Sequence, residues 1–431
     1  MELTSVKIEG FRNIESDQIR FGDNITSLVS VNSFGKSNLL AAIDFAIDFI
    51  NASPRRKNQL MQHTSGIPLN RKIDSKDFLA EFVFLTDFDD KQCYVKYGFS
   101  FTWVKNQGGK KISGEWLSIK EVGKSKKSER LINRAEKPLF KSSPTGRCSK
   151  VVNVNDNELI INKLIGVDKL YYLNIVEQIN HIKIHVDRHL DASDLYSQRI
   201  RIIDPSDADD QETFDFHGVT DIPRLVYRLK SKNPDYYDIL VDTFMQLFPN
   251  IISVTLHEID TAIDDSLFQK DIPFTIDNKV YSIFVTDRNL NQPLDFKTMS
   301  DGAKRVFLML TFTIIANIKN YHLIAFEEPE NSIHPSLLQS YLSVLSQLVG
   351  NCKIIVTSHS PYILQYVNTS DIYIGKPNEM GLASFAKIDE KRVNALLKDA
   401  TDSGESVGNY IFDLLSGGED DTDILLSYLE K

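Results

Sequence analysis

The stretch Ser30-Val31-Asn32-Ser33-Phe34-Gly35-Lys36-Ser37 decides the fold of this chain, because it joins two apolar runs of different character. Residues 25–29 form a short run typical of a buried strand, and residues 39–50 form a longer, helix-like run. A turn that carries Gly-Lys-Ser between a strand and a helix is the setting of a P-loop. Its backbone N–H groups and the helix N-terminus would create a concave site for phosphate.

The residues of this turn predict contacts to ATP and Mg²⁺. Lys36 can reach the β- and γ-phosphates, and the Ser37 hydroxyl can bind Mg²⁺. The predicted nucleotide-binding set also includes the neighbours of this pair: Asn32, Ser33, Phe34, Gly35 and Asn38. Ser30 stands where the pattern has its first glycine, and a small residue fits there when the backbone angles are ordinary.

The composition is that of a large globular chain. It has 431 residues, of which 42% are hydrophobic, and a net charge of −10. This charge argues against a chain that coats nucleic acid as a whole, although a local basic surface stays open. Three widely spaced cysteines indicate neither a zinc site nor a disulfide framework. We expect a cytoplasmic protein without a membrane segment, since no signal-peptide pattern and no apolar run of about 18 residues is present.

A second motif lies far along the chain, at Met299-Ser300-Asp301-Gly302-Ala303-Lys304-Arg305, before the apolar run 306–316. A serine and a glycine at a helix N-terminus can present a hydroxyl and backbone N–H groups to a phosphate. Ser300 and Gly302 are therefore candidate nucleotide contacts. Ser300 is equally suited to a simple helix N-cap, which is the alternative.

Two later strand-like runs each end in polar residues. Residues 323–326 lead into Glu327 and Glu328, as in a Walker B strand. Adjacent side chains of a strand point in different directions, so one carboxylate can hold the Mg²⁺ shell while the other polarises water. Residues 353–357 lead to Ser358 and His359, whose imidazole can contact a γ-phosphate or orient water. The candidate catalytic residues are Glu327, Glu328 and His359.

In this order the four segments resemble the ABC-type ATPase heads of the RecF, SMC, Rad50 and OLD proteins. The sequence Phe326-Glu327-Glu328-Pro329-Glu330-Asn331-Ser332-Ile333-His334-Pro335 is similar to the compact AAA-family ATPases of prokaryotic defence loci. The resemblance covers residues 1–75 and 290–375. It implies an α/β fold, in which a P-loop NTPase sheet with flanking helices is interrupted by a long β-rich and helical insertion.

The resemblance also implies roles for single residues. Ser37 and Glu327 would be the metal ligands, Glu328 the catalytic glutamate and His359 the switch histidine. Ser300 and Gly302 would close on a nucleotide held by another protomer, and Arg12 would lie near the nucleotide. Ser30 and Glu327 depart from the family pattern, and either departure would slow hydrolysis.

The resemblance divides the chain into four predicted parts. Residues 1–75 hold the P-loop half of the head, 76–290 the insertion, 291–375 the second half of the head and 376–431 a C-terminal extension. Within the insertion, residues 105–147 are rich in lysine and arginine. They predict either a contact to nucleic acid or an acidic partner, or a set of solvated hairpin tips.

One segment imitates the second motif. Leu415-Ser416-Gly417-Gly418-Glu419 looks more like an ABC signature than the Ser300 segment does, but no Walker B strand follows it. We interpret it as the end of a helix and a turn.

Several relatives are excluded by spacing. The interval between Lys36 and Ser300 lacks the heptads of an SMC or Rad50 coiled coil. Few residues follow His359, too few for a Toprim nuclease domain as in OLD proteins. We therefore expect an ATPase that is not itself a nuclease.

The favoured hypothesis is the ATPase subunit of a Septu-like or retron-associated antiphage system. Such a subunit would form an ATP-linked homodimer or a higher even oligomer. It would gate a separate effector protein, typically an HNH nuclease, with a Toprim nuclease as a close variant. The alternatives are a RecF-like repair ATPase that clamps DNA directly, favoured by the basic stretch, and an inactive nucleotide-binding scaffold.

Overall fold

The computed structural model describes most of the chain as two compact units. Unit 1 comprises residues 1–187, 320–328 and 351–431, and unit 2 comprises residues 188–319 and 329–350. The residues described are 1–22, 25–30, 34–62, 67–104, 111–124, 127–167, 169–188, 192–197, 201–203, 221–261, 275–277, 279–375 and 380–430.

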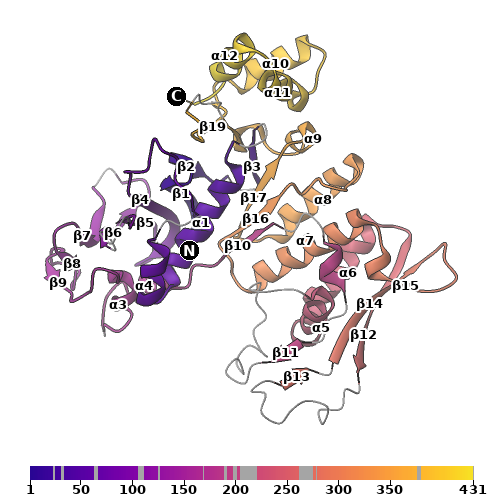
Figure 1. Cartoon of the computed structure of the whole chain (residues 1–431), viewed down its shortest axis with the longest axis horizontal. Coiled ribbons are helices and arrows are strands. Elements are labelled where there is room, and N and C mark those ends of the chain that lie inside the picture. The colour runs from indigo at the N-terminus through magenta and orange to yellow at the C-terminus, as the bar shows by residue number, and fades with distance from the viewer. Residues whose placement is uncertain are drawn as a thin grey trace. The chain divides into compact units, whose positions relative to one another are not determined.

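A six-stranded sheet forms the centre of unit 1 (Figure 1). Its order is β10-β16-β17-β3-β18-β19, and its neighbours run parallel apart from β18 with β19. The strands are β10 (Ile184–Asp187), β16 (Leu323–Glu327), β17 (Lys353–Ser358), β3 (Ile25–Val29), β18 (Ile372–Gly375) and β19 (Phe385–Lys387). Parallel strands end at one edge of a sheet, so the polar residues that follow β3, β16 and β17 come together there. The predicted P-loop NTPase sheet is confirmed.

An eight-stranded antiparallel sheet makes up much of the rest of unit 1, in the order β2-β1-β4-β5-β6-β7-β8-β9. The strands are β1 (Glu2–Phe11), β2 (Ile14–Arg20), β4 (Phe78–Phe88), β5 (Lys91–Thr102), β6 (Lys111–Glu121), β7 (Glu129–Arg134), β8 (Pro138–Phe140) and β9 (Lys150–Val151). The sheet joins both sides of the boundary predicted at residues 75 and 76, because β1 pairs with β4 as well as with β2. The β-rich part of the predicted insertion is therefore continuous with the N-terminal strands.

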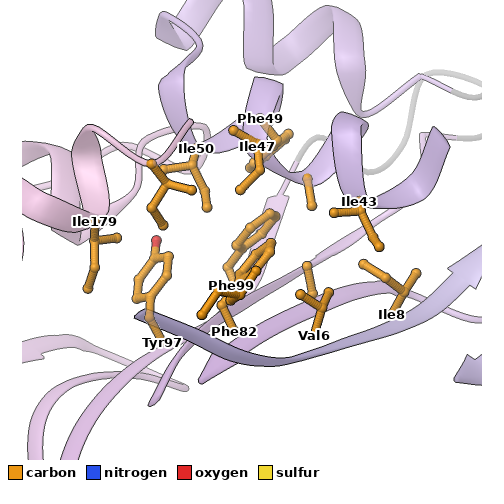
Figure 2. Close-up of a cluster of buried hydrophobic side chains, with 14 of the residues drawn as sticks. Val6, Ile8, Ile43, Ile47, Phe49, Ile50, Phe82, Tyr97, Phe99 and Ile179 are labelled. Carbon is orange, nitrogen blue, oxygen red and sulfur yellow. The ribbon is translucent and has the colours of Figure 1, made fainter. Parts of the chain in front are cut away.

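The core of unit 1 lies between this antiparallel sheet and α1 (Lys36–Asn51). Figure 2 shows apolar side chains of α1 above those of β1, β4 and β5. The Phe49 ring stacks on Phe99 and on Phe101, with 4.9 Å between ring centroids in each pair. Burying one such ring contributes about 1.5–3 kcal/mol, so this cluster fixes α1, and with it Lys36, against the sheet. The short helices α2 (Pro54–Leu60), α3 (Ile160–Leu164) and α4 (Leu173–Asn180) also belong to unit 1, and α3 and α4 contribute buried residues to the same cluster.

The C-terminal part of unit 1 is helical after β18 and β19. It contains α10 (Val393–Asp402), α11 (Val407–Ser416) and α12 (Glu419–Ser427). The short helix α9 (Pro361–Leu364) and the 3₁₀ helix η5 (Thr369–Asp371) lie between β17 and β18. The described residues include no helix long and apolar enough to cross a membrane.

Unit 2 combines helices with two small antiparallel sheets. Its helices are α5 (Ile222–Lys232), α6 (Pro234–Leu247), α7 (Asp301–Ile318), α8 (Pro335–Leu348) and the 3₁₀ helices η1 (Ser193–Tyr196) and η4 (Phe296–Thr298). One sheet pairs β11 (Arg201–Ile203) with β13 (Thr275–Asp277), and the other has the order β12 (Ile251–Asp260), β14 (Lys279–Asp287), β15 (Leu294–Asp295). Helices α5 and α6 and strand β12 lie within residues 76–290, the predicted insertion.

A buried carboxyl group ties the antiparallel sheet to α3. Glu115 of β6 has no exposed surface, and it accepts hydrogen bonds from the backbone N–H groups of Ile160 and Ile161 at 2.6 and 2.8 Å. The Tyr97 hydroxyl donates to the same carboxylate at 3.3 Å. Burial raises the pKa of Glu115 to about 7, although these hydrogen bonds and the charge of Arg134 oppose it. The folded protein therefore binds a proton here that the unfolded chain releases nearer pH 4.5.

This linkage predicts a pH-dependent stability. The contribution of Glu115 is fully present below about pH 4.5 and is lost as the pH rises through about 7, because its pKa is higher in the folded state. Relative to Glu115→Gln, the wild-type protein should lose up to about 3 kcal/mol of unfolding free energy across this range. Urea unfolding of both proteins at several pH values measures the difference. Parallel pH profiles for the two proteins would contradict the assignment.

Candidate functional site

The P-loop begins at the end of β3 and ends in α1. Gly35 is the N-cap residue of α1, with a φ of 97°, a left-handed conformation that glycine adopts without strain. Lys36 and Ser37 are the first two residues of the helix, and Phe34 precedes them, half-buried. Asn32 and Ser33, which the sequence also places in the nucleotide site, lie outside the described residues.

Among the described residues, Ser30 and His359 hold the Lys36 ammonium group. Its Nζ donates to the Ser30 carbonyl and to Ser30 Oγ, both at 3.1 Å, and lies 3.0 Å from His359 Nε2. Lys36 is only 6% exposed, and burying an ammonium group is costly unless hydrogen bonds replace water. The serine that departs from the P-loop pattern thus supplies two of the contacts that position the lysine.

Ser30 fits at this position because a glycine faces it. Gly375 ends β18, and a Cβ atom on it would lie 2.5 Å from Ser30 Cβ and 3.2 Å from the Phe385 ring. Atoms at the first distance overlap, so the side chain of residue 30 and the missing side chain of residue 375 share one space. No local sequence pattern indicates this pair, because residues 30 and 375 meet only through the pairing of β3 with β18.

The P-loop serine and the first Walker B carboxylate meet directly. Ser37 Oγ donates to Glu327 Oε2 at 3.0 Å, which joins the start of α1 to the end of β16. A hydroxyl and a carboxylate are hard oxygen ligands of the kind that Mg²⁺ prefers. The described residues contain no group of three or more His, Cys, Asp or Glu side chains that could hold a metal ion, so Mg²⁺ here would need phosphate oxygens as well.

Glu328 and His359 lie beside this pair. Glu328 has a φ of 46°, which a residue with a side chain adopts only when its surroundings enforce it, and its N–H donates to the Thr357 carbonyl at 2.9 Å. Its Oε1 lies 3.6 Å from His359 Nε2. Burial and the nearby Lys36 ammonium lower the pKa of His359, although Glu328 opposes the change. The imidazole is therefore neutral at pH 7 and can accept a hydrogen bond from Lys36.

Arg12 also lies beside the P-loop helix. Its Nη1 donates to Asn38 Oδ1 at 2.8 Å, and Asn38 in turn donates to Asn13 Oδ1 at 2.8 Å. Arg12 and Asn38 thus meet beside the start of α1, and a contact of either with a nucleotide stays a prediction. Asn13 was not predicted as a site residue, and the only sequence signal for it is that it follows Arg12 in the turn between β1 and β2.

The second motif belongs to unit 2. Ser300 is the N-cap of α7, and its Oγ accepts from the Ala303 N–H at 3.3 Å, so the helix-capping function is present. Gly302 is buried, and a Cβ atom there would lie 2.2 Å from the Ser332 carbonyl oxygen. A contact of either residue with a nucleotide remains a prediction. The similar segment around Ser416 is the end of α11 and the turn before α12, as interpreted.

Comparison with protein families gives two matches that overlap and together span most of the chain. A family described as "AAA domain" matches residues 5–216. A second, described as "AAA domain, putative AbiEii toxin, Type IV TA system", matches residues 188–365. The first match contains the P-loop, and the second contains Ser300, Glu327, Glu328 and His359.

Among curated proteins, the chain is similar to the DNA double-strand break repair Rad50 ATPase of Methanococcus maripaludis. The two are 24% identical over 191 residues, which cover 42% of this chain but only 17% of the Rad50 chain. Over these stretches the chain is therefore similar to AAA domains and to a part of a Rad50 ATPase.

Solved structures of SMC heads are also similar. An SMC head bound to the C-terminal winged-helix domain of ScpA is 12% identical, with a TM-score of 0.49, and covers 92% of this chain and 100% of that one. The SMC head domain of Thermotoga maritima is 11% identical, with a TM-score of 0.43, and covers 90% and 100%. The parallel sheet and its P-loop define the fold of the present chain without these distant alignments.

The contact between residues 30 and 375 gives a test of the P-loop geometry. Gly375→Ala should lower the unfolding free energy by about 1–3 kcal/mol because the new methyl group overlaps Ser30. Ser30→Gly in the same chain should restore part of the loss, and a double-mutant cycle from urea unfolding measures this coupling.

A matched control is Gly166→Ala, where a Cβ atom would meet only ordinary contacts, the nearest atom being 3.8 Å away. This substitution should change the unfolding free energy little. The cycle compares the effect of Gly375→Ala in the wild-type chain with its effect in the Ser30→Gly chain. If Gly375→Ala lowers the unfolding free energy equally in both chains, the two positions do not share space.

Proposed function

We propose that this chain binds and hydrolyses ATP with Mg²⁺ as the ATPase subunit of a two-component antiphage defence complex. The observation that carries the ATPase part is the convergence of Lys36, Ser37, Glu327, Glu328 and His359 at one edge of the parallel sheet. These five side chains come from three separate stretches of sequence, and each has a chemical role in phosphoryl transfer.

Each residue would act on ATP from its present position. Lys36 would exchange its contacts with Ser30 and His359 for the β- and γ-phosphates. Ser37 and Glu327 would hold Mg²⁺ together with the nucleotide, and the bound ion would supply neutralisation of phosphate charge. Glu328 would orient the attacking water and accept its proton. The neutral His359 would donate a hydrogen bond to the γ-phosphate and so report its presence.

The proposed complex works through closure of two heads. Ser300 and Gly302 of one protomer would contact the nucleotide of the other, so that ATP binding drives dimerisation. The motion would hold or release a separate effector, an HNH or Toprim nuclease, as in the Septu and retron systems whose ATPase subunit PtuA the motifs resemble. The family description that names a "Type IV TA system" supports a role beside a second component.

A second candidate function is a repair ATPase that clamps DNA directly. The similarity to a segment of Rad50 supports this function as well as the first. The charge distribution supports it too, because residues 91–150 carry fifteen lysines and arginines and only four acids. Partner capture separates the two candidates.

The nucleotide site is tested by two substitutions with opposite expected effects on binding. Lys36→Ala should abolish ATP binding in a fluorescent-nucleotide titration, because it removes the cation that reaches the phosphates. Glu328→Gln should bind ATP and hydrolyse it roughly a hundredfold more slowly, since a general base is lost.

Glu330→Gln, the same change two residues further on, is the matched control and should retain turnover. If Glu330→Gln loses turnover while Glu328→Gln keeps it, the general base is misassigned. Unchanged ATP affinity in Lys36→Ala would refute the P-loop assignment.

Head closure is tested in the Glu328→Gln background. Adding Ser300→Arg should leave ATP binding by the monomer intact and prevent the ATP-dependent dimer, as measured by light scattering after size exclusion. Ser416→Arg places the same bulk at the similar segment and should leave the dimer intact. The reverse pattern would identify the Ser416 segment as the signature.

The effector is sought by capturing tagged Glu328→Gln from its host lysate with ATP. A stoichiometric nuclease, absent when Lys36→Ala is used as bait, would support the two-component complex. Nucleic acid without a protein partner would instead support the DNA clamp.

A further inference from the structure

The outer face of the antiparallel sheet in unit 1 combines exposed cations with aromatic rings. We call it the basic sheet face and define it by Tyr94 and Lys96 of β5, Trp116 and Lys120 of β6 and Arg130 of β7. The opposite face of the same strands carries the buried core residues, including Tyr97, Phe99 and Leu117. The basic sheet face belongs to a region of strongly positive charge, with fifteen basic residues against four acids over residues 91–150.

The register of the strands brings these side chains together. Lys96 pairs with Ser118, which pairs with Arg130, so two cations flank a small residue across three strands. Tyr94 lies opposite Lys120 in the next row of the same face. Directly paired residues have Cβ atoms about 4.5–5.5 Å apart, so these groups form one continuous surface.

The Trp116 ring lies across the middle strand. Trp116 pairs with Gly98, and a Cβ atom on Gly98 would lie 2.4 and 2.6 Å from two atoms of the indole. The indole N–H reaches beyond β5 to donate to Glu81 of β4 at 2.8 Å. The ring is therefore fixed over the glycine, and Trp116 is half-buried.

The three cations of the basic sheet face differ in whether a carboxylate of the protein already pairs with them. Lys96 forms an ion pair with Glu81 at 2.8 Å, and this pair steadies the lysine beside the indole. Lys120 and Arg130 are exposed, and neither makes an ion pair within the part of the chain that the structure describes. Lys120 also lines a neighbouring cavity of 220 Å³ together with Lys91, Lys124 and Lys127, although Asp89, Glu121 and Glu129 line it too.

We propose that the basic sheet face binds single-stranded nucleic acid. Bases would stack on Trp116 and Tyr94, and phosphates would pair with Lys120 and Arg130. Flat aromatic rings beside cations suit a single strand, because its bases are free to stack whereas those of a duplex are not. An acidic protein would satisfy the cations but would make no use of the held indole.

The negative charge of the whole chain does not oppose this site. Residues 389–431 contain eleven acids and four bases, so seven of the ten net negative charges lie in this C-terminal stretch. The proposal also rests on no step of the ATPase cycle. Lys36→Ala should lose ATP binding and is expected to keep nucleic-acid binding. The ATPase proposal and the nucleic-acid proposal can therefore fail independently of each other.

The test uses the intrinsic fluorescence of the full chain. The protein has two tryptophans, and Trp103 is buried, with its N–H bonded to the Gly10 carbonyl. Titration with oligothymidylate of about 20 nucleotides should quench Trp116, and a duplex of the same length should quench it much less. Trp116→Phe should remove the quench, and Trp116→Ala should weaken binding of the fluorescein-labelled oligonucleotide about tenfold in an anisotropy titration.

Charge reversal supplies the second measurement. Lys120→Glu with Arg130→Glu should weaken binding and lower the slope of log affinity against log salt by about one per residue. Lys391→Glu with Lys398→Glu makes the same change in net charge on the exposed surface near and within α10 and should have little effect. Equal losses in both double variants, tight binding without a Trp116 quench, or a failure to bind oligothymidylate would each overturn the proposal.

Discussion

The parallel pairing of β17 with β16 on one side and β3 on the other is the constraint on which the site depends. Glu327 is in register with Thr357, and Thr357 is in register with Leu28. Each of the three strands ends within two residues of these paired positions, and the residues that follow are Glu328, His359 and Ser30. A shift of one strand by a single residue would turn its side chains to the other face and separate Lys36 from His359. The sheet register, rather than any loop, therefore sets the distances in the site.

The contacts around Lys36 show how this scaffold supports a buried charge. An ammonium group carries three N–H donors, and the structure gives it the Ser30 carbonyl, the Ser30 hydroxyl and a neutral imidazole. A glycine at position 30 would supply only the carbonyl. The departure from the P-loop pattern is thus compatible with a functional lysine, and Gly375 provides the space that the extra side chain needs.

The sequence predicts the local elements well and their long-range pairing poorly. The strand, turn and helix around Gly35, and the strands that end at Glu327 and Ser358, follow from hydrophobic runs a few residues long. The pairing of β1 with β4 crosses a predicted domain boundary, and the contact of residues 30 and 375 spans most of the chain. Such contacts depend on register and side-chain volume at distant positions, and no window of sequence contains both partners. Asn13 escaped prediction for a related reason, because its partner Asn38 lies on another element.

Glu327 stands where the family pattern has an aspartate, and its longer side chain reaches the Ser37 hydroxyl. Its Oε2 accepts a hydrogen bond from the Ser37 hydroxyl at 3.0 Å, so the added methylene does not separate the two expected metal ligands. Glu328, one residue later, is turned by a left-handed backbone conformation toward His359 rather than toward Ser37. The strain at residue 328 and the extra length at residue 327 therefore have complementary effects. They place two adjacent carboxylates on two different partners, in keeping with the alternation of side chains along a strand.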